Sequence, residues 1–122
     1  MARRDDLDGS LLTPPNGGPV YLVMFGELHW IPNPGTYDNL FTSWDVIVKS
    51  TDLPSIDRGF DFSNGALLVR GVGSAPVYLV TGQSRFWVTS PDAMTKYHFN
   101  WNKVDVVPDT LVNAIPQGAN IS

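Results

Sequence analysis

The stretch Pro19-Val20-Tyr21-Leu22-Val23 occurs a second time in the chain as Pro76-Val77-Tyr78-Leu79-Val80. Three residues downstream of it recur at the same spacing of 57 positions, so that Trp30, Pro34 and Trp44 return as Trp87, Pro91 and Trp101. Without gaps, residues 19–44 and 76–101 are identical at eight of 26 positions. Repetition over such a length indicates two copies of one supersecondary unit. With a few insertions the copies cover about residues 5–59 and 61–118.

The size of the chain limits how these copies can fold. A chain of 122 residues with 43% hydrophobic side chains is long enough for one ordinary core, whereas a single copy lies near the lower limit for folding alone. The segment 57–64 between the copies contains Phe60 and Phe62, and flexible linkers are usually poor in aromatic residues. The sequence therefore predicts one domain over residues 1–122, in which the two repeats are related by a pseudo-twofold axis.

Each copy begins with the local pattern of a short sheet. Val20–Val23 is rich in β-branched and aromatic residues, which is typical of a strand buried on both faces. Phe25-Gly26 follows as a turn, and Leu28–Ile31 is the return strand. The same elements fall at residues 77–80, 81–83 and 85–88 of the second copy. An Asp-Gly or Asn-Gly turn precedes a further strand in each copy, at residues 10–13 and 66–70.

A short helix and a last strand complete each copy. Asn33 and Ser90 each precede a proline, and this order favours a capped helix start, here for helices over Pro34–Phe41 and Pro91–His98. Further strands are expected at residues 46–49 and 104–107, and helical turns opened by an Asp cap at residues 52–56 and 109–115. The predicted fold class is mainly β with short helices, built from two copies of a strand–hairpin–helix–strand unit of about 55 residues.

Composition argues against several classes of function. The chain has no cysteine, a net charge of −4 and no clustered cationic face, so thiolate metal sites and nucleic-acid partners are not expected. It has no apolar stretch long enough to form a transmembrane segment. Its first six residues are not followed by the apolar run of a signal peptide, so none is expected in the given chain. The acidic run Asp5, Asp6 and Asp8 fits a turn better than a calcium loop, because Asn64 replaces Asp8 in the second copy.

Candidate catalytic groups are scarce. His29 aligns with Phe86 and His98 with Phe41, so that both histidines occupy positions where the other copy has a ring, which favours packing over catalysis or metal binding. Glu27 is the only glutamate, and no set of acid, base and nucleophile is evident. We therefore expect no catalytic residues, no metal and no cofactor. A small glycan hydrolase with a carboxylate pair is the enzymatic alternative.

The four tryptophans allow two interpretations. They either pack in the core, which a small chain needs and which we expect, or stand exposed as platforms for sugar rings. In the second case, neighbouring polar side chains would complete a ligand site in each copy. The candidate ligand-binding residues are Trp30, Asn33, Asp38 and Asn39 in the first copy and Arg85, Trp87, Ser90 and Asp92 in the second.

The run Val20-Tyr21-Leu22-Val23, followed by His29-Trp30-Ile31-Pro32-Asn33-Pro34, Thr36-Tyr37, Leu40 and Trp44, resembles a short repeat that recurs in tandem in bacterial secreted or surface-associated proteins. The resemblance implies a modular, extracellular, non-catalytic unit and assigns no functional residue. Together with the aromatic content, it leads us to expect a lectin-like recognition module for a glycan or another cell-surface component. The alternative is a structural or protein-interaction module, part of a secreted effector or toxin, that forms homo-oligomers through an edge strand such as Val104–Val107.

Overall fold

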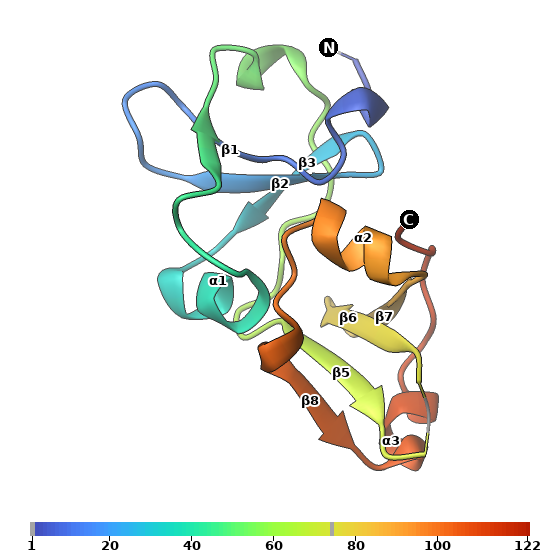
Figure 1. The fold of residues 1–122 in the computed structure, drawn as a ribbon. Helices are drawn as coiled ribbons and strands as arrows, with labels where there is room; N and C mark the ends of the chain where they lie inside the picture. The colour runs from blue at the N-terminus through green and yellow to red at the C-terminus, as the bar shows by residue number, and fades with distance from the viewer. Residues whose placement is uncertain (1, 74) are drawn as a thin grey trace.

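The computed structural model describes residues 2–73 and 75–122 and contains two four-stranded sheets, one from each copy (Figure 1). The strand order is β3-β2-β1-β4 in the first sheet and β7-β6-β5-β8 in the second. In each sheet the first three strands are antiparallel, and the fourth lies parallel to its neighbour. The strands are β1 (Leu11–Thr13), β2 (Val20–Met24), β3 (Glu27–Ile31), β4 (Ile47–Lys49), β5 (Leu67–Gly71), β6 (Val77–Thr81), β7 (Ser84–Val88) and β8 (Val104–Val107).

The matching sheets confirm the β-rich fold and the duplication predicted from sequence. Tyr21 and Tyr78 occupy equivalent positions, since Tyr21 lies opposite Trp30 in β3 and Tyr78 lies opposite Trp87 in β7. The hairpin turn between these strands places two consecutive residues at positive φ in both copies, Phe25-Gly26 and 82–83. Two such residues are what a tight two-residue hairpin of the primed type requires, so the turn geometry is common to the copies although its glycine has moved by one position.

The helices are short. They are α1 (Pro34–Leu40), α2 (Pro91–Lys96) and α3 (Asp109–Ala114), with the 3-10 turns η1 (Asp5–Leu7), η2 (Leu53–Ser55) and η3 (Trp101–Lys103). Within the part of the chain that the structure describes, none of them has the length and hydropathy needed to cross a lipid bilayer.

The predicted helix starts at Asn33 and Ser90 are confirmed. The Asn33 side chain accepts a hydrogen bond from the Thr36 backbone N–H at 2.9 Å, and Ser90 accepts one from the Ala93 N–H at 3.1 Å. These bonds satisfy N–H groups that the first helical turn leaves free. The predicted Asp caps are wrong: Asp52 makes no side-chain cap bond to η2, and the cap position of α3 is Pro108.

Helices α1 and α2 each contact the copy to which they do not belong, so they lie at the junction between the sheets (Figure 1). The Thr36 hydroxyl in α1 accepts a hydrogen bond from the Gly65 N–H at 3.0 Å, in the turn before β5. In the reverse direction, Gly9 in the turn before β1 lies so close to α2 that a side chain there would overlap the Lys96 carbonyl. In both directions the glycine turn of one copy thus contacts a helix of the other, at the first turn of α1 in one case and at the last residue of α2 in the other.

A continuous hydrophobic core includes residues from both copies. At its centre Phe41 and Phe99 form an isolated antiparallel bridge, with their rings stacked at a centroid distance of 5.6 Å. The constant spacing of 57 had paired Phe41 with His98, and the structure corrects this alignment. His98 has a φ of +59° and is one extra residue at the end of the second helix, so that Phe99 takes the place equivalent to Phe41.

An extended segment closes each copy along the outer edge of its hairpin. Residues 58–62 lie beside β3, and residues 117–121 lie beside β7. Gly59 faces the buried ring of His29, and Gly118 faces the ring of Phe86 in the same way. His29 is held in this position because its two ring nitrogens each lie 2.8 Å from a backbone oxygen, of Met24 and of Phe60. The glycines thus leave room for a ring that the other elements fix.

Replacing Gly59 by alanine is expected to lower the free energy of unfolding by about 1–3 kcal/mol, because the new methyl group would overlap the His29 ring. Urea denaturation measures the difference. The matched control is Gly35→Ala in α1, where the nearest atom to the new methyl group would be Asn33 Oδ1 at 3.4 Å. That change should be neutral or stabilise the protein by up to about 1 kcal/mol. Equal stabilities for the two variants would contradict the packing of Gly59 on His29.

Candidate functional site

A surface groove lies in the first copy where the hairpin meets the start of α1. Its volume is about 340 Å³, within the range of about 300–1,000 Å³ that small-molecule sites occupy. The loop before β2, the end of β3 and the first turns of α1 form it. We call it the first groove; it is lined by Gly18, Pro19, Val20, Trp30, Ile31, Pro32, Asn33, Pro34, Tyr37 and Trp44.

The second copy contains a groove of about 390 Å³ in the equivalent place, which we call the second groove. It is lined by Ala75, Pro76, Val77, Trp87, Val88, Thr89, Ser90, Pro91, Met94 and Trp101. Every one of these ten residues is 57 positions after a residue of the first groove. The two grooves are therefore the same site in two copies.

The residues retained between the copies are concentrated in these grooves. Of the nine groove positions within residues 19–44, five are identical in the second copy, whereas only three of the other seventeen positions are. Those three are Tyr21, Leu22 and Val23 in β2, and two of them, Leu22 and Val23, are fully buried. Within residues 19–44, retention outside the β2 strand is thus restricted to the groove walls. Four of the five retained wall residues, Pro19, Trp30, Pro34 and Trp44, lie outside the buried core, whereas the fifth, Val20, packs against it.

The expectation that the tryptophans pack in the core is wrong. Trp44 and Trp101 are 46% and 53% exposed, and Trp30 and Trp87 are half-buried. Buried aromatic rings are supplied instead by other residues at the junction of the copies: Tyr37, Phe41, Phe62, Phe86, Tyr97 and Phe99. Each groove has one half-buried and one exposed indole in its walls, and such amphipathic rings are frequent where proteins bind ligands.

The exposed wall of the first groove is held rigidly. The Trp44 ring stacks on Tyr37 with centroids 4.0 Å apart, and the indole N–H donates a hydrogen bond to Asp38 Oδ1 at 2.9 Å. Tyr37 is itself fixed, because it is buried and its hydroxyl donates to the Ser43 carbonyl at 2.6 Å. In the second groove Met94 and Thr95 replace Tyr37 and Asp38, so that neither contact is available to Trp101.

Four of the eight candidate ligand-binding residues line a groove. Trp30 and Asn33 lie in the first groove and Trp87 and Ser90 in the second. The Asn33 amide is already engaged, since it caps α1 and donates to Asn64 Oδ1 at 2.7 Å. The Ser90 oxygen also serves as a helix cap, and its hydroxyl hydrogen remains available to a ligand.

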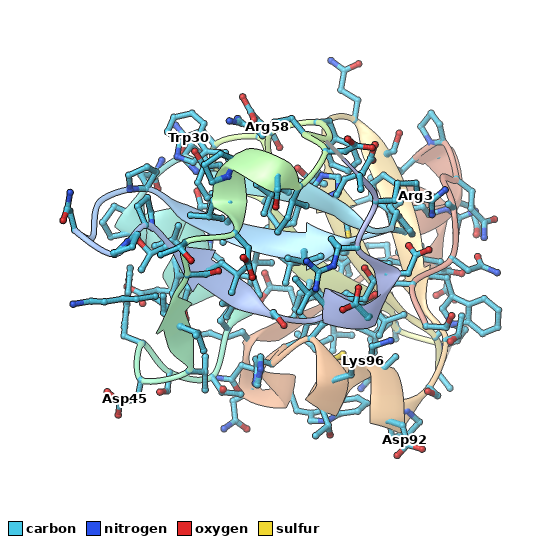
Figure 2. All side chains as sticks on the ribbon, turned by 90° about the horizontal axis from the view of Figure 1, so that it is seen from above. Arg3, Trp30, Asp45, Arg58, Asp92 and Lys96 are labelled. Carbon is cyan, nitrogen blue, oxygen red and sulfur yellow. The ribbon has the colours of Figure 1, made fainter. Side chains whose placement is uncertain are left out.

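The other four candidates lie outside the groove linings. Asp38 orients Trp44 from behind, and Asn39 donates to the Ala66 carbonyl at 3.3 Å across the junction. Arg85 lies over the Tyr78 ring next to the second groove, and Asp92 is exposed on the first turn of α2. Figure 2 shows Asp92 and Lys96 of α2 on the side of the molecule opposite Trp30 and Arg58.

The grooves offer stacking surfaces and hydrogen-bond donors, and their walls offer little acid–base chemistry. The indole N–H groups of Trp30, Trp87 and Trp101 have no hydrogen-bond partner among residues 2–73 and 75–122. Tyr37 is the one titratable side chain in either lining, and burial raises its pKa to about 12. No three His, Asp or Glu side chains in the described ranges are placed to hold a metal ion.

The sequence pointed to the groove residues that were not among the candidate ligand-binding residues. Pro19, Pro34 and Trp44 recur unchanged in the second copy, as do Trp30 and Val20, and these five are half of the ten residues that line the groove. Retention after duplication therefore identifies the groove, whereas a search for polar neighbours of the tryptophans identifies residues that mostly stabilise the fold. No protein-family model matches the chain, and no curated protein matches it significantly.

Proposed function

We propose that this chain is a non-enzymatic recognition module that binds a carbohydrate in its two equivalent grooves. The observation that carries the proposal is that both grooves retain two prolines and two tryptophans that lie outside the buried core. A half-exposed indole presents an apolar face to the C–H groups of a sugar ring, and its N–H can donate to a hydroxyl. The resemblance to a tandem repeat of bacterial surface-associated proteins is consistent with this function.

The scarcity of titratable groups in the grooves supports binding over catalysis. Hydrolysis of a glycosidic bond requires a carboxylic acid and a second carboxylate close to the bond. Neither lining contains a carboxylate, and the Asp38 carboxylate behind the first groove accepts a hydrogen bond from the Trp44 indole. A ligand held between the tryptophans would therefore meet no general acid on the groove walls.

Removing the half-buried indole of one groove is expected to abolish binding there and leave the other groove intact. Trp30→Ala and Trp87→Ala should each reduce the stoichiometry in calorimetric titration with an oligosaccharide from two sites per chain to one. The affinity at the altered site should fall tenfold or more, as expected when an aromatic residue contributing about 1.4 kcal/mol or more is removed. The double variant should not bind.

Leu111→Ala is the matched control, because Leu111 is 58% exposed on α3 and lies in neither groove lining. It should bind like the unmodified protein. A folded protein that binds no member of a broad glycan array, or a double variant that binds as well as the unmodified protein, would contradict the proposal.

A protein-interaction module is the second candidate, because each sheet ends in a strand with exposed apolar side chains. β4 and β8 are the edge strands, and Val48 and Val106 are 55% and 51% exposed. Such edges can pair with another chain. Light scattering after size exclusion would detect a homo-oligomer, and Val106→Lys should dissociate it.

A further inference from the structure

In both copies a guanidinium group lies over the tyrosine next to the groove. The Cζ atom of Arg58 is 4.9 Å from the ring centroid of Tyr21, and that of Arg85 is 4.8 Å from the ring centroid of Tyr78. Because each tyrosine lies opposite the half-buried tryptophan of its groove, each copy carries a row of tryptophan, tyrosine and arginine. Figure 2 shows Trp30 and Arg58 on the same side of the molecule.

The two arginines come from different places in the repeat. Arg58 belongs to the extended segment that closes the first copy, where it is bridged to Leu28 of β3. Arg85 belongs to β7, at the position equivalent to Leu28, and its bridge partner in the closing segment is Gln117. The arginine has thus changed strand between the copies, while its guanidinium has the same place over the tyrosine.

Common ancestry does not explain this coincidence, because the two arginines are not aligned. A single cation over an aromatic ring would need no explanation, since such contacts occur about once per 70–80 residues. The same placement reached from two strands, each time beside a retained tryptophan groove, indicates that a positive charge is needed at that end of the site.

Both guanidinium groups retain donors for a ligand. The Arg58 side chain is 52% exposed and shares one amino group with Asp61 at 3.2 Å. Arg85 uses Nε to donate to the Ile115 carbonyl at 3.0 Å, and within residues 2–73 and 75–122 its two terminal amino groups have no hydrogen-bond partner. A guanidinium presents its donors as a planar fork that matches the oxygens of a carboxylate or a sulfate.

The surface around the arginine is also hollowed in the first copy. Tyr21, Leu28 and Arg58 line a separate cavity of about 230 Å³. Tyr21, which lines this cavity, lies directly opposite Trp30, which lines the first groove. A ligand of two or more rings would extend from Trp30 across Tyr21 to Arg58.

We propose that the ligand of both grooves is an acidic saccharide, in which one sugar ring stacks in the groove and a carboxylate or sulfate binds to Arg58 in the first copy and to Arg85 in the second. This inference rests on the proposed carbohydrate-binding function and adds the charge and the minimum length of the ligand. It also assigns Asp61 a role as an internal competitor, because its carboxylate occupies part of the Arg58 fork.

An array of matched oligosaccharides tests the inference, with each neutral compound accompanied by its uronic-acid form and its sulfated form. We expect the acidic members to bind at least tenfold more tightly than their neutral partners, and the stronger of the two acidic arms identifies the anionic group. Raising the salt concentration should weaken the binding of acidic members and leave that of neutral members unchanged.

Variants of the charged residues complete the test by calorimetric titration. Arg58→Gln together with Arg85→Gln should remove the tenfold preference for acidic ligands, whereas Asp61→Asn should tighten acidic binding several-fold at the first groove. Arg3→Gln is the matched control, because it removes a positive charge whose side chain pairs with Asp5 and lies near neither tyrosine. Circular dichroism confirms that each variant is folded.

The possible failures are distinct. Equal binding of acidic and neutral members, or an unchanged preference in the double arginine variant, overturns the acidic-ligand inference and leaves the carbohydrate-binding function standing. A folded protein that binds no member of the array overturns the proposed function and the inference together.

Discussion

Raising the pH from 10 to 12 is expected to destabilise the protein strongly, because two tyrosines are held neutral in its interior. Tyr37 is 1% exposed, and burial raises its pKa to about 12. Burial also raises the pKa of Tyr97, and the nearby Asp8 and Asp5 carboxylates add to the effect. In the unfolded chain both hydroxyl groups lose their protons near pH 10. The stabilisation is therefore complete below pH 10 and is lost as the pH rises through the pKa values of the folded state.

For Tyr37 alone the loss between pH 10 and pH 12 is about 2 kcal/mol, since one pKa unit corresponds to about 1.4 kcal/mol and each transition is half complete at its own pKa. Circular dichroism and tyrosinate absorbance, followed together against pH, should show unfolding and ionisation of these tyrosines in the same transition. Ionisation of Tyr37 and Tyr97 near pH 10 in a protein that stays folded would contradict the prediction.

Replacing Phe99 by alanine is expected to lower the free energy of unfolding by about 3–5 kcal/mol. Phe99 is 2% exposed and stacks on Phe41 of the other copy and on Tyr97 of its own, with centroid distances of 5.6 Å and 5.8 Å. Its removal leaves a cavity at the junction where the copies meet. Since small domains are stable by only about 5–15 kcal/mol, the variant should be close to unfolding at room temperature.

Trp101→Ala is the control for this prediction, because it removes a larger ring two residues further along the chain from a position that is 53% exposed. Urea denaturation should show a cost of less than about 1 kcal/mol for this change. A cost at Phe99 no greater than that at Trp101 would mean that the junction is not the centre of the core.

The sequence predicted the elements that depend on interactions between residues close together in the chain. The Asn33-Pro34 and Ser90-Pro91 pairs predicted the helix starts, because capping depends only on the residues of the first turn. The recurrence of Val20–Val23 predicted matching hairpins, since a strand pattern is independent of its distant partners. These local patterns gave the repeat and the class of fold.

Features that depend on contacts between residues far apart in the sequence were not predicted. Nothing near Trp30 or Trp44 indicates that the core is already filled by rings from helix ends and from the segment between the copies, which leaves the tryptophans at the surface. The extra residue at His98 was not predicted either, because its effect, which is to bring Phe99 opposite Phe41, is seen only in the folded chain. The grooves became visible once the retained residues were placed in space, although each of them was already known to recur.

The contacts between the helix of one copy and the turn of the other have a consequence for dissecting the chain. A separated half would lose the surface of the other copy that its helix contacts, and its side of the Phe41–Phe99 pair would be exposed to water. Because the two halves are covalently joined, these contacts form within one chain and do not depend on protein concentration. The two halves are therefore expected to depend on each other for folding.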